Sequence, residues 1–492
     1  MKIYNTLTRQ KEEIKPIEGD FIRIYSCGLT VYDYAHIGNL RKYIFDDVLK
    51  RTLVYFDYKV KHVQNVTDVG HLTSDEDEGE DKIEKGAIRE GKTAFEIAKF
   101  YEQAFVEDLK KLNIELPDEM PRATENIQEQ IELVKKLEEK GFTYKTSDGI
   151  YFDTSKLKDY GKLARLDMEN LKEGSRVEKN PEKKNSTDFA LWKFSGEAFT
   201  SSGARRQMEW PSPWGVGFPG WHLECSAMAT KFLGQPFEIH TGGVDHIAVH
   251  HTNEIAQSEA AYGKPLAEYW VHSEHLLQDG RKMAKSAGHF IRLQDLEAKG
   301  YSPLDFRYLC LTAHYRSKLD FSWQSLDAAR SARRKINDAY SVSLRLPTVA
   351  LAKAGAEQSE PNGSSSSRQN SDNLSRTGCG IGDLNPFNKV LADDLDTPRA
   401  LAFIFENLSK LSSVDFEKID EIFAILEKIE TKKEDGIIIE GYAPREVIKL
   451  VLERQKAREQ KNFKKSDELR DKIFKLGFNI EDTSEGPEIF HK

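Results

Sequence analysis

The 492-residue sequence has no apolar run long enough to cross a membrane, since a spanning helix needs about 18 to 20 consecutive apolar residues. Its first residues lack the basic-then-apolar pattern of a secretory signal, so we expect a cytoplasmic protein. It has only four cysteines, which are scattered: Cys27, Cys225, Cys310 and Cys379. Such cysteines argue against a disulfide framework and for a reducing compartment. There is no internal repeat, and a net charge of −9 does not by itself indicate nucleic-acid binding.

Residues 26–39, which read SCGLTVYDYAHIGN, carry the most informative pattern in the chain. An apolar strand is predicted at 21–27, a helix at 39–57, and a second strand at 58–67. Ligands of such a βαβ unit lie beyond the carboxyl ends of its strands. The first N–H groups of a helix are unpaired and lie at the positive end of its dipole, so we expect a phosphate to bind at the tetrad 36–39. Further along the chain, the pattern predicts a strand at 268–277, helical sequence over 303–345, and helices at 444–460 and 464–476.

A second candidate for phosphate binding lies far downstream, in the segment 282–286, which reads KMAKS. His36 and Asn39 could hold the α-phosphate side of a nucleoside triphosphate. Lys282 and Lys285 could hold the leaving pyrophosphate, because fixed cations and N–H donors stabilise the charge that develops in the reaction. In the simpler alternative, His36 caps the helix and the lysines are surface charge. Both motifs occur in this order with strand–helix patterns between them, so we favour the nucleotide site.

A set of cysteine, histidine and glutamate residues has the composition of a metal site. His250 and Glu254 are four residues apart on a predicted helix, so both side chains project from one face. With Cys27 and Cys225 they could form a four-coordinate Zn²⁺ site, although the spacing is not that of a local zinc finger. Buried cysteines also act as small hydrophobes, so the residues alone leave both interpretations open. Three further imidazoles compete as the nitrogen ligand: His240, His246 and His251.

The C-terminal part of the chain is basic although the whole chain is acidic. Residues 445–475 hold eleven Lys or Arg and six Asp or Glu, a net charge of +5, and the phenylalanines Phe463, Phe474 and Phe478 are interspersed in and just after this segment. A basic helical module can bind an RNA backbone while aromatic rings stack on unpaired bases. The alternative is an ordinary solvated helix face, and the local sequence favours neither.

Several stretches of the sequence match one known pattern. They are Cys27-Gly28 with 30–33, His36-Ile37-Gly38-Asn39, residues 218–228, His250-His251 with 253–257, residues 282–286, and residues 457–483. Together they resemble the cysteinyl-tRNA synthetases, a family of class I aminoacyl-tRNA synthetases, and the surroundings of Cys225 are the most diagnostic. The departures from the family's usual pattern are Leu29, Ala248, Val249, Thr252 and Ala284. None is a candidate ligand or phosphate-binding residue, so they affect loop geometry more than chemistry.

The resemblance implies an α/β fold with a doubly wound, Rossmann-like parallel sheet, an inserted domain, a helical bundle and a small C-terminal RNA-binding domain. The two halves of the catalytic domain are expected at 1–116 and 206–278, with an inserted connective domain at 117–205 between them. A lysine-loop and tRNA-stem region is expected at 279–325, a helical bundle at 326–435, and an anticodon-binding domain at 436–492. Within the bundle, the Ser-, Asn- and Gly-rich segment 353–384 predicts a disordered linker.

The resemblance also implies roles for individual residues. One Zn²⁺ per chain would be held by Cys27, Cys225, His250 and Glu254, and would bind the thiolate of substrate cysteine. Soft sulfur binds zinc better than a serine hydroxyl does, whereas size and shape hardly separate the two amino acids. The cysteine pocket would include Gly28, Thr67 and Trp221. ATP, with Mg²⁺, would contact His36, Gly38, Asn39, Gly242, Gly243, Asp245, Lys282, Met283, Lys285 and Ser286, of which His36, Asn39, Lys282 and Lys285 are the expected catalytic residues.

The implied reaction activates L-cysteine with ATP to cysteinyl-adenylate and transfers it to the 3′ end of tRNA(Cys), with no membrane partner and a monomer favoured. A cysteine ligase that acts on a small-molecule amine is one alternative, but its known relatives lack the basic C-terminal module. A non-catalytic RNA-binding paralogue is another, but such a protein should have lost His36, Lys282 and Lys285. We therefore expect a cysteine–tRNA ligase.

Overall fold

The computed structural model describes residues 1–69, 82–165, 181–195, 206–278, 280–282, 290–345, 384–427, 431–434, 436–440, 444–483 and 486–491. The linker expected at 353–384 lies outside them except for Leu384, as do Met283, Lys285 and Ser286. The chain divides into two compact units, Met1–Ile425 and Leu426–Lys492. Among the described residues, no helix combines the length and apolar character that a membrane span requires.

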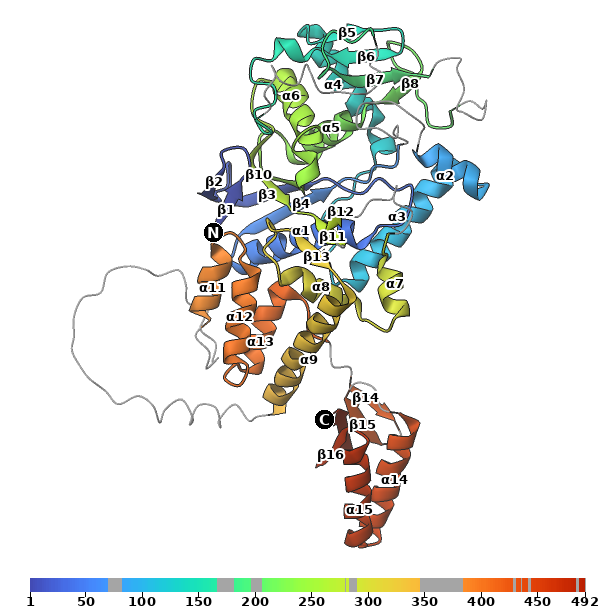
Figure 1. Ribbon diagram of the computed structural model, residues 1–492, viewed down its shortest axis with the longest axis vertical. Helices are drawn as coiled ribbons and strands as arrows, with labels where there is room; N and C mark the ends of the chain where they lie inside the picture. Colours follow the sequence, from blue (N-terminus) through green and yellow to red (C-terminus); the bar gives the residue numbers. More distant parts are fainter. Residues whose placement is uncertain are drawn as a thin grey trace, which may run out of the picture. The chain divides into compact units, whose positions relative to one another are not determined.

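The first unit is organised around a parallel four-stranded sheet (Figure 1). Its strands are β3 (Phe21–Ser26), β4 (Lys59–Gln64), β9 (Phe237–Gly243) and β10 (Ala267–Ser273), in the order β10-β9-β3-β4. β9 pairs directly with β3, so Ile24 lies opposite Ile239. Strand ends from two distant parts of the sequence therefore meet at one edge of the sheet, as the doubly wound prediction requires.

Helices cover both faces of this sheet. Figure 1 shows α5 (Trp221–Leu233) and α6 (His250–Tyr262) on one side and α1 (Ile37–Tyr55) on the other. α1 packs against β4 and β9, whereas α5 packs against β3, β4 and α6. Because both faces are covered, β9 is buried along almost its whole length. The core between the sheet and α5 includes two cysteines, Cys27 and Cys225, beside Met228 and Trp270.

The inserted part builds a small antiparallel sheet on top of α5 and α6. It consists of β5 (Thr143–Lys145), β6 (Gly149–Phe152), β7 (Phe189–Phe194) and β8 (Gly217–Pro219), next to helix α4 (Ile127–Glu139). One apolar cluster packs the insertion against the two helices, and it includes Leu137, Phe152, Leu223 and Ala260. β8 hydrogen-bonds β7, so the inserted sheet extends past residue 205, where we expected the insertion to end.

The remaining elements of the first unit are short strands and helices. The strands are β1 (Lys2–Asn5) with β2 (Gln10–Glu13), and β11 (Leu276–Gln278) with β12 (Arg281–Lys282) and β13 (Leu319–Phe321). The helices are α2 (Lys82–Glu90), α3 (Ala94–Lys111), α7 (Leu293–Ala298), α8 (Pro303–Leu311), α9 (Trp323–Arg345), α11 (Asn385–Ala392), α12 (Thr397–Asn407) and α13 (Ser413–Phe423). In Figure 1 the helices α8, α9 and α11–α13 lie at the end of this unit opposite the insertion.

Two breaks in this region differ from the sequence prediction. We expected one strand at 268–277, but β10 ends at Ser273, and β11 pairs with β13 instead of β9. The chain changes partner because the N–H of Glu274 donates to the carbonyl of Tyr315 at 2.8 Å. The continuous helical region expected at 303–345 is likewise interrupted by β13. Both breaks depend on contacts between distant segments, which a local pattern does not contain.

The second unit is a four-stranded sheet covered by two helices. The helices are α14 (Arg445–Glu459) and α15 (Phe463–Lys475), and the strands β14 (Thr431–Glu434), β15 (Ile437–Glu440), β16 (Phe478–Thr483) and β17 (Gly486–His491) follow the order β14-β15-β17-β16. Ile437, Val451, Ile473 and Ile489 form its core. The sequence predicted the helices and missed the sheet, because its strands are short and carry many charges.

A fully buried ion pair joins α1 to α8. The carboxylate of Asp47 accepts from the guanidinium of Arg307, and both side chains have 0% exposure. Arg307 also donates to the carbonyl of Phe423 at 2.6 Å and to that of Leu112 at 3.0 Å. These bonds satisfy the guanidinium in the core, so α1, α8 and the end of α13 are held at one point.

Replacing Asp47 should therefore destabilise the first unit. Asp47→Ala leaves the buried charge of Arg307 without its counter-ion, which should lower the free energy of unfolding by about 3–5 kcal/mol. Chemical denaturation followed by tryptophan fluorescence measures the change. Asp393→Ala is the control, because Asp393 and Lys11 form an exposed pair that should contribute less than about 1 kcal/mol. Equal losses in the two variants would contradict the role of the buried pair.

Candidate active site

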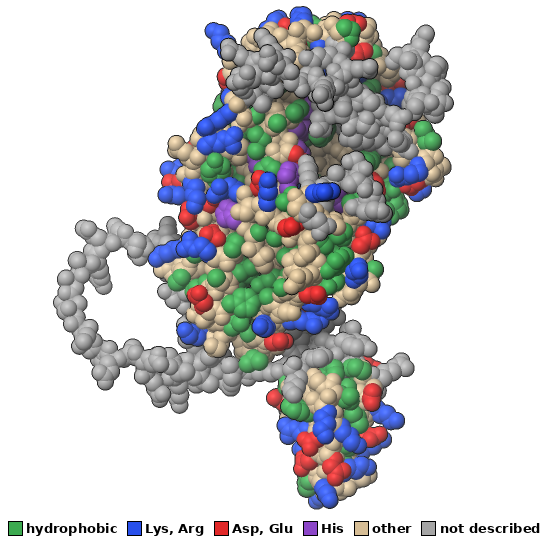
Figure 2. Space-filling model, in the orientation of Figure 1, with side chains coloured by type: hydrophobic (Ala, Val, Ile, Leu, Met, Phe, Trp, Pro, Cys, Tyr) green, Lys and Arg blue, Asp and Glu red, His purple; other side chains and the backbone are tan. Residues whose placement is uncertain are grey.

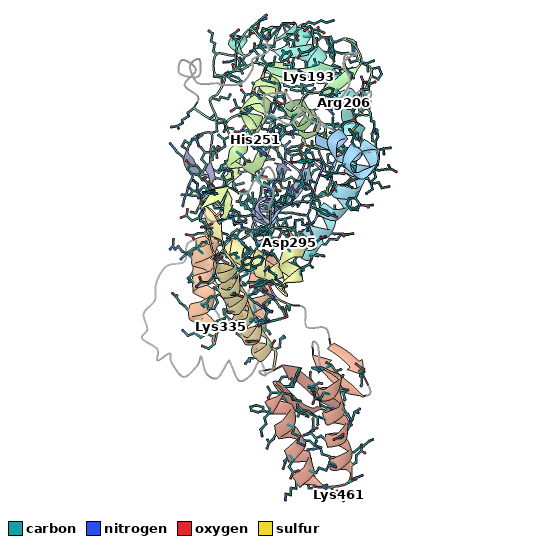
Figure 3. The ribbon with its side chains drawn as sticks, turned by 45° about the vertical axis from the view of Figure 1, so that its right-hand side comes forward. Lys193, Arg206, His251, Asp295, Lys335 and Lys461 are labelled. Carbon is teal, nitrogen blue, oxygen red and sulfur yellow. The ribbon has the colours of Figure 1, made fainter. Side chains whose placement is uncertain are left out.

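The candidate metal ligands meet at the carboxyl edge of the parallel sheet. Cys27 directly follows β3, Cys225 lies on α5, and His250 and Glu254 lie on α6. All four are buried, with exposures of 3%, 1%, 2% and 0%. Figure 2 shows histidine side chains together on one face of the first unit, and Figure 3 labels His251 among them. The residues singled out by their chemistry are thus brought into one cluster.

The separations within this cluster suit a tetrahedral ion. The Sγ atoms of Cys27 and Cys225 are 4.0 Å apart, and Cys27 Sγ is 3.7 Å from Oε1 of Glu254. Nε2 of His250 is 3.1 Å from the same carboxylate oxygen. A tetrahedral Zn²⁺ with Zn–S near 2.3 Å and Zn–N near 2.0 Å separates its donor atoms by about 3.3–3.8 Å. Two thiols, one imidazole and one carboxylate at these distances fit the ion, and we call these four residues the cage.

A second group of four donors overlaps the cage. Cys27, His240, His251 and Glu254 also place one ligand atom each within 4.8 Å of one another. Nε2 of His251 lies 3.3 Å from Cys27 Sγ, and Nε2 of His240 lies 3.0 Å from Oε2 of Glu254. Two of the three competing imidazoles thus remain candidates, whereas His246 belongs to neither group of described residues.

The imidazoles around the cage orient its ligands. His240 faces Oε2 of Glu254, which leaves Oε1 turned toward Cys27 and His250. Nδ1 of His250 shares a hydrogen bond of 3.0 Å with Nδ1 of His222, which directs its Nε2 into the cage. A ligating histidine is commonly held in this way through its other ring nitrogen. The geometry therefore favours His250 as the ligand, with His222 as its supporting partner and His240 as the supporting partner of Glu254.

Burial and mutual contact shift the pKa values of the cage. Burial and the contact with Cys225 raise the pKa of the Cys27 thiol, while the hydrogen bond from Cys27 lowers the pKa of Cys225 to about 7. Burial opposes the charge of His250, but Glu254 raises its pKa to about 10. Burial also opposes the charge of Glu254, and His240 and His250 hold its pKa below the ordinary range. At neutral pH the cluster therefore already carries a carboxylate and a readily formed thiolate.

The residues expected to line the amino-acid pocket lie beside the cage. The N–H of Gly28 donates to Oδ1 of Asn65 at 2.8 Å, and Nδ2 of Asn65 donates to Oγ1 of Thr67 at 2.9 Å. A Cβ on Gly28 would lie 1.6 Å from the carbonyl oxygen of Asn65, so only glycine fits there. The ring of Trp221 lies 4.4 Å from that of His250. Sequence reasoning missed Asn65, whose only signal was its place at the end of a predicted strand.

His36 caps the helix α1. Its Nδ1 accepts the N–H of Asn39 at 3.1 Å, and Oδ1 of Asn39 accepts the N–H of His36 at 3.2 Å. Since Nδ1 acts as an acceptor, the proton of the neutral ring sits on Nε2. His36 is therefore the N-cap of α1, and the capping box joins it to Asn39 in both directions.

The segment 290–292 occupies part of the helix N-terminus. The N–H of Ile37 donates to the carbonyl of Ile291 at 2.9 Å, and the ring of Phe290 lies 5.9 Å from that of His36. Our expectation that the first N–H groups are unpaired is therefore wrong for Ile37 and Asn39. The chain shortly after the segment 282–286, which we call the lysine segment, is thus hydrogen-bonded to the start of α1. At the other end of the lysine segment, β12 pairs with β11.

The remaining nucleotide residues follow β9. A Cβ on Gly242 would lie 2.4 Å from Cε1 of His251, so this glycine lets the imidazole pack against the sheet. A Cβ on Gly243 would lie 2.5 Å from Oδ1 of Asp245, which is exposed in a short 3₁₀ helix (Val244–His246). Gly242 therefore has a packing role in addition to its predicted contact with the nucleotide.

Known proteins match the chain over its whole length. The model of the class I (C) tRNA synthetase catalytic domain matches residues 13–331. The chain is 44% identical to cysteine–tRNA ligase 1 of Burkholderia lata, covering 100% of this chain and 97% of that protein. This chain belongs to the cysteine–tRNA ligase family. The family's Treponema denticola member is 43% identical, with 98% of each chain covered.

A solved structure supports the fold of this cysteine–tRNA ligase family member. The Mycobacterium tuberculosis methionyl-tRNA synthetase in complex with methionyl-adenylate covers 83% of this chain and 82% of its own, with a TM-score of 0.51. At 14% identity this is a likeness of fold alone. The predicted family, the class I synthetase fold and the enzyme class, an aminoacyl-tRNA synthetase, are confirmed.

The capping role of His36 can be separated from other roles by substitution. His36→Ala removes the acceptor for the N–H of Asn39 and should lower the free energy of unfolding by about 1 kcal/mol. His36→Asn restores a good N-cap acceptor and should recover most of that loss. Urea denaturation of both variants measures the difference. An equal loss in the two variants would show that the ring is needed for packing rather than for the cap.

Proposed function

We propose that this chain attaches L-cysteine to tRNA(Cys) in two steps, through a cysteinyl-adenylate made from ATP. The observation that carries the proposal is the buried cage at the carboxyl edge of the sheet, where this class of fold binds its ligands. The curated relatives that span the whole chain are named cysteine–tRNA ligases. A monomer in the cytoplasm, without a membrane partner, completes the proposal.

Cys27, Cys225, His250 and Glu254 would hold one Zn²⁺. When bound, the ion supplies a soft Lewis acid that prefers a thiolate to a hydroxyl. Gly28, Thr67 and Trp221 would line the space in which the amino acid lies. The closeness of Gly28 to Asn65 fixes the backbone next to Cys27, so the pocket has a rigid wall. Selection against serine would then rest on chemistry rather than on pocket size.

The nucleotide would lie between the N-terminus of α1 and the lysine segment. His36 and Asn39 would hold the α-phosphate side, and Gly38 would let the phosphate approach the backbone. Lys282 and Lys285 would neutralise the leaving pyrophosphate, with Met283 and Ser286 beside them and Mg²⁺ accompanying ATP. Gly242, Gly243 and Asp245 would contact the nucleoside, Asp245 at its ribose. No protein nucleophile is needed, because positioning and charge stabilisation lower the barrier.

Asn39 would act through the cap as well as through its own amide. Its Oδ1 is engaged with the N–H of His36, so its Nδ2–H₂ group is the part that can donate to a phosphate. Lys42, one turn further along α1, donates to the carbonyl of Cys27 at 2.7 Å and pairs with Asp46 at 2.7 Å. The same helix thus supports the phosphate end and the thiol end of the proposed site.

The second unit would bind the anticodon part of tRNA(Cys). Its helices α14 and α15 carry the basic segment, and Phe463 and Phe474 are 60% and 47% exposed. Residues eleven apart lie on one helix face, so both rings can face the same partner. Arg454 is instead bonded to Asp482 at 2.7 and 2.8 Å, which gives it an internal role. A ligase for a small amine would not need this basic unit.

Transfer of labelled cysteine to total tRNA, with ATP and an excess of serine, tests the proposed function. We expect ATP-dependent labelling of tRNA that serine does not reduce, and no product when tRNA is omitted. Cysteine-dependent pyrophosphate exchange without labelled tRNA would instead support the small-amine ligase. Absence of both activities would support a non-catalytic paralogue and overturn the proposal.

The zinc content of three variants distinguishes the two donor groups. Cys225→Ala should lose the metal, whereas His240→Ala should retain it with about 10- to 100-fold lower affinity, as for an outer hydrogen-bonding partner. Cys310→Ala is the control, because this buried cysteine belongs to neither group. Metal analysis after equilibration with a chelator measures the change. Zinc retained by Cys225→Ala and lost by His240→Ala would assign the second group instead.

A further inference from the structure

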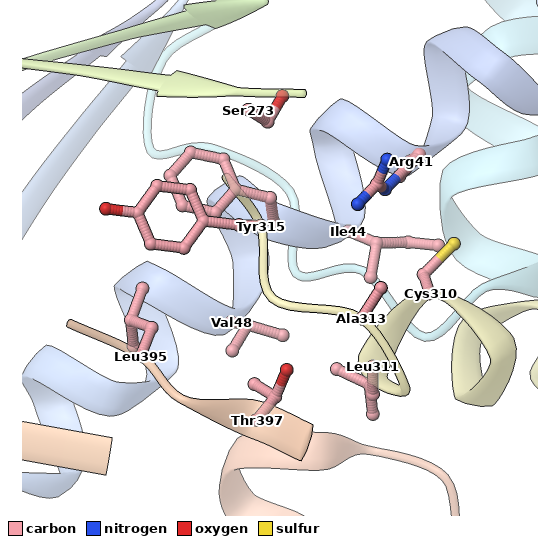
Figure 4. A pocket seen from close by; sticks show the side chains of 11 residues that line it. Arg41, Ile44, Val48, Ser273, Cys310, Leu311, Ala313, Tyr315, Leu395 and Thr397 are labelled. Carbon is pink, nitrogen blue, oxygen red and sulfur yellow. The ribbon is translucent and has the colours of Figure 1, made fainter. Parts of the chain in front are cut away.

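Two consecutive residues of α1, Arg41 and Lys42, carry buried positive charges to which the proposed reaction assigns no step. Their exposures are 3% and 9%, and Arg41 lies in the wall of a small pocket beside α1 (Figure 4). Lysine and arginine are seldom buried unless they are paired. Consecutive side chains on a helix project about 100° apart, so the two charges are directed to different parts of the unit.

The guanidinium of Arg41 is bonded to the two segments that lead into the sheet of β11, β12 and β13. It donates to the carbonyl oxygens of Glu274 (3.0 Å) and His275 (2.6 Å), which lie just before β11. It also donates to the carbonyl oxygens of His314 (3.4 Å) and Ser317 (2.6 Å), in the turn between α8 and β13. One side chain of α1 therefore holds the entry to both strands.

These bonds bear on the lysine segment through β11. This strand lies in the middle of its sheet, with β13 on one side and β12, where the lysine segment begins, on the other. Arg41 follows Asn39 by two residues on the same helix. Arg41 therefore joins the helix that begins at the tetrad 36–39 to the strand that carries the start of the lysine segment.

Lys42 is bonded instead to the backbone of a cage residue. Its Nζ donates to the carbonyl of Cys27 at 2.7 Å and pairs with Oδ2 of Asp46 at 2.7 Å. Cys27 directly follows β3, so this carbonyl lies where the strand ends and the chain turns into Gly28. A bond at this point fixes the backbone from which the Cys27 thiol reaches the cage.

We propose that Arg41 and Lys42 are positioning residues for separate halves of the site. Arg41 holds the lysine segment within reach of the phosphates at the tetrad 36–39, and Lys42 holds the thiol of Cys27 in the cage. The inference rests on the proposed function, because it requires a nucleotide at the tetrad and Zn²⁺ in the cage. Each residue acts through carbonyl groups of the chain, so its loss should impair one half of the site and spare the other.

Full-length Arg41→Met and Lys42→Met variants test this separation. Arg41→Met should raise the KM for ATP and slow cysteine-dependent pyrophosphate exchange by up to about 100-fold, as a displacement of about 1 Å can. Its affinity for zinc, measured by competition with a chelator, should equal that of the wild type. Lys42→Met should bind zinc about 10- to 100-fold more weakly, the usual effect of losing a group that supports a ligand. Its KM for ATP should be unchanged when zinc is saturating.

Two further variants separate positioning from a general loss of stability. Lys50→Met removes a basic side chain of α1 that donates to the carbonyl of Leu116 at 3.4 Å, and it should change neither property. The double variant Lys42→Met/Asp46→Leu removes the whole buried pair and leaves no unpaired charge, so the fold should stay stable. Its zinc affinity should remain as low as that of Lys42→Met, because the bond to the carbonyl of Cys27 is still missing.

Three results would overturn the proposal. They are wild-type zinc affinity in Lys42→Met or in the double variant, wild-type pyrophosphate exchange in Arg41→Met, and losses of both properties in both single variants. Failure of the proposed function itself is a different result. A wild type that binds no zinc and exchanges no pyrophosphate with cysteine would overturn that function, and this inference with it.

Discussion

The structure depends on holding four proton-binding side chains together in the dry core of one unit. Cys27, Cys225, His250 and Glu254 lie within reach of a single ion at exposures of 3% or less. Like charges in such a place repel strongly, and each group needs a partner in the fold. The surrounding imidazoles supply those partners, and three separate segments of the parallel sheet and its helices supply the geometry. A small displacement of any of these segments would open the cluster.

Helix α1 connects this cluster to the rest of the unit. Its first turn is closed by His36 and by the carbonyl of Ile291, and Lys42 donates to the carbonyl of Cys27. Further along, Asp47 meets Arg307 in the core. Helix α1 therefore fixes the relative positions of the proposed phosphate-binding residues, the proposed thiol-binding residues and the helical end of the unit. This arrangement allows positioning to serve as the main source of catalysis.

From the sequence we could predict residues of uncommon, reactive types that occur in a recognisable pattern. The cage and the tetrad 36–39 fall into this class, and the structure brings the cage residues together and places the tetrad at the start of α1. The sequence did not allow prediction of contacts made by common residues from distant segments. This second class includes the hydrogen bond between Asn65 and Gly28 and the one between Ile291 and Ile37. It also includes the change of strand partner after Ser273. The sheet of the second unit was hidden for two reasons: its strands are short and charged, and the pairing of β15 with β17 joins residues 50 positions apart, Ile439 and Ile489 (489 minus 439).

The central position of β9 in the sheet has a consequence for biosynthesis. The pairing of Ile24 with Ile239 joins residues 215 positions apart, 239 minus 24. At typical elongation rates the ribosome needs about 10 to 40 s to make that intervening chain. For most of this interval Cys27 exists without Cys225. The thiol and the unpaired edge of β3 therefore wait for their partners until the inserted domain has been synthesised and β9 follows.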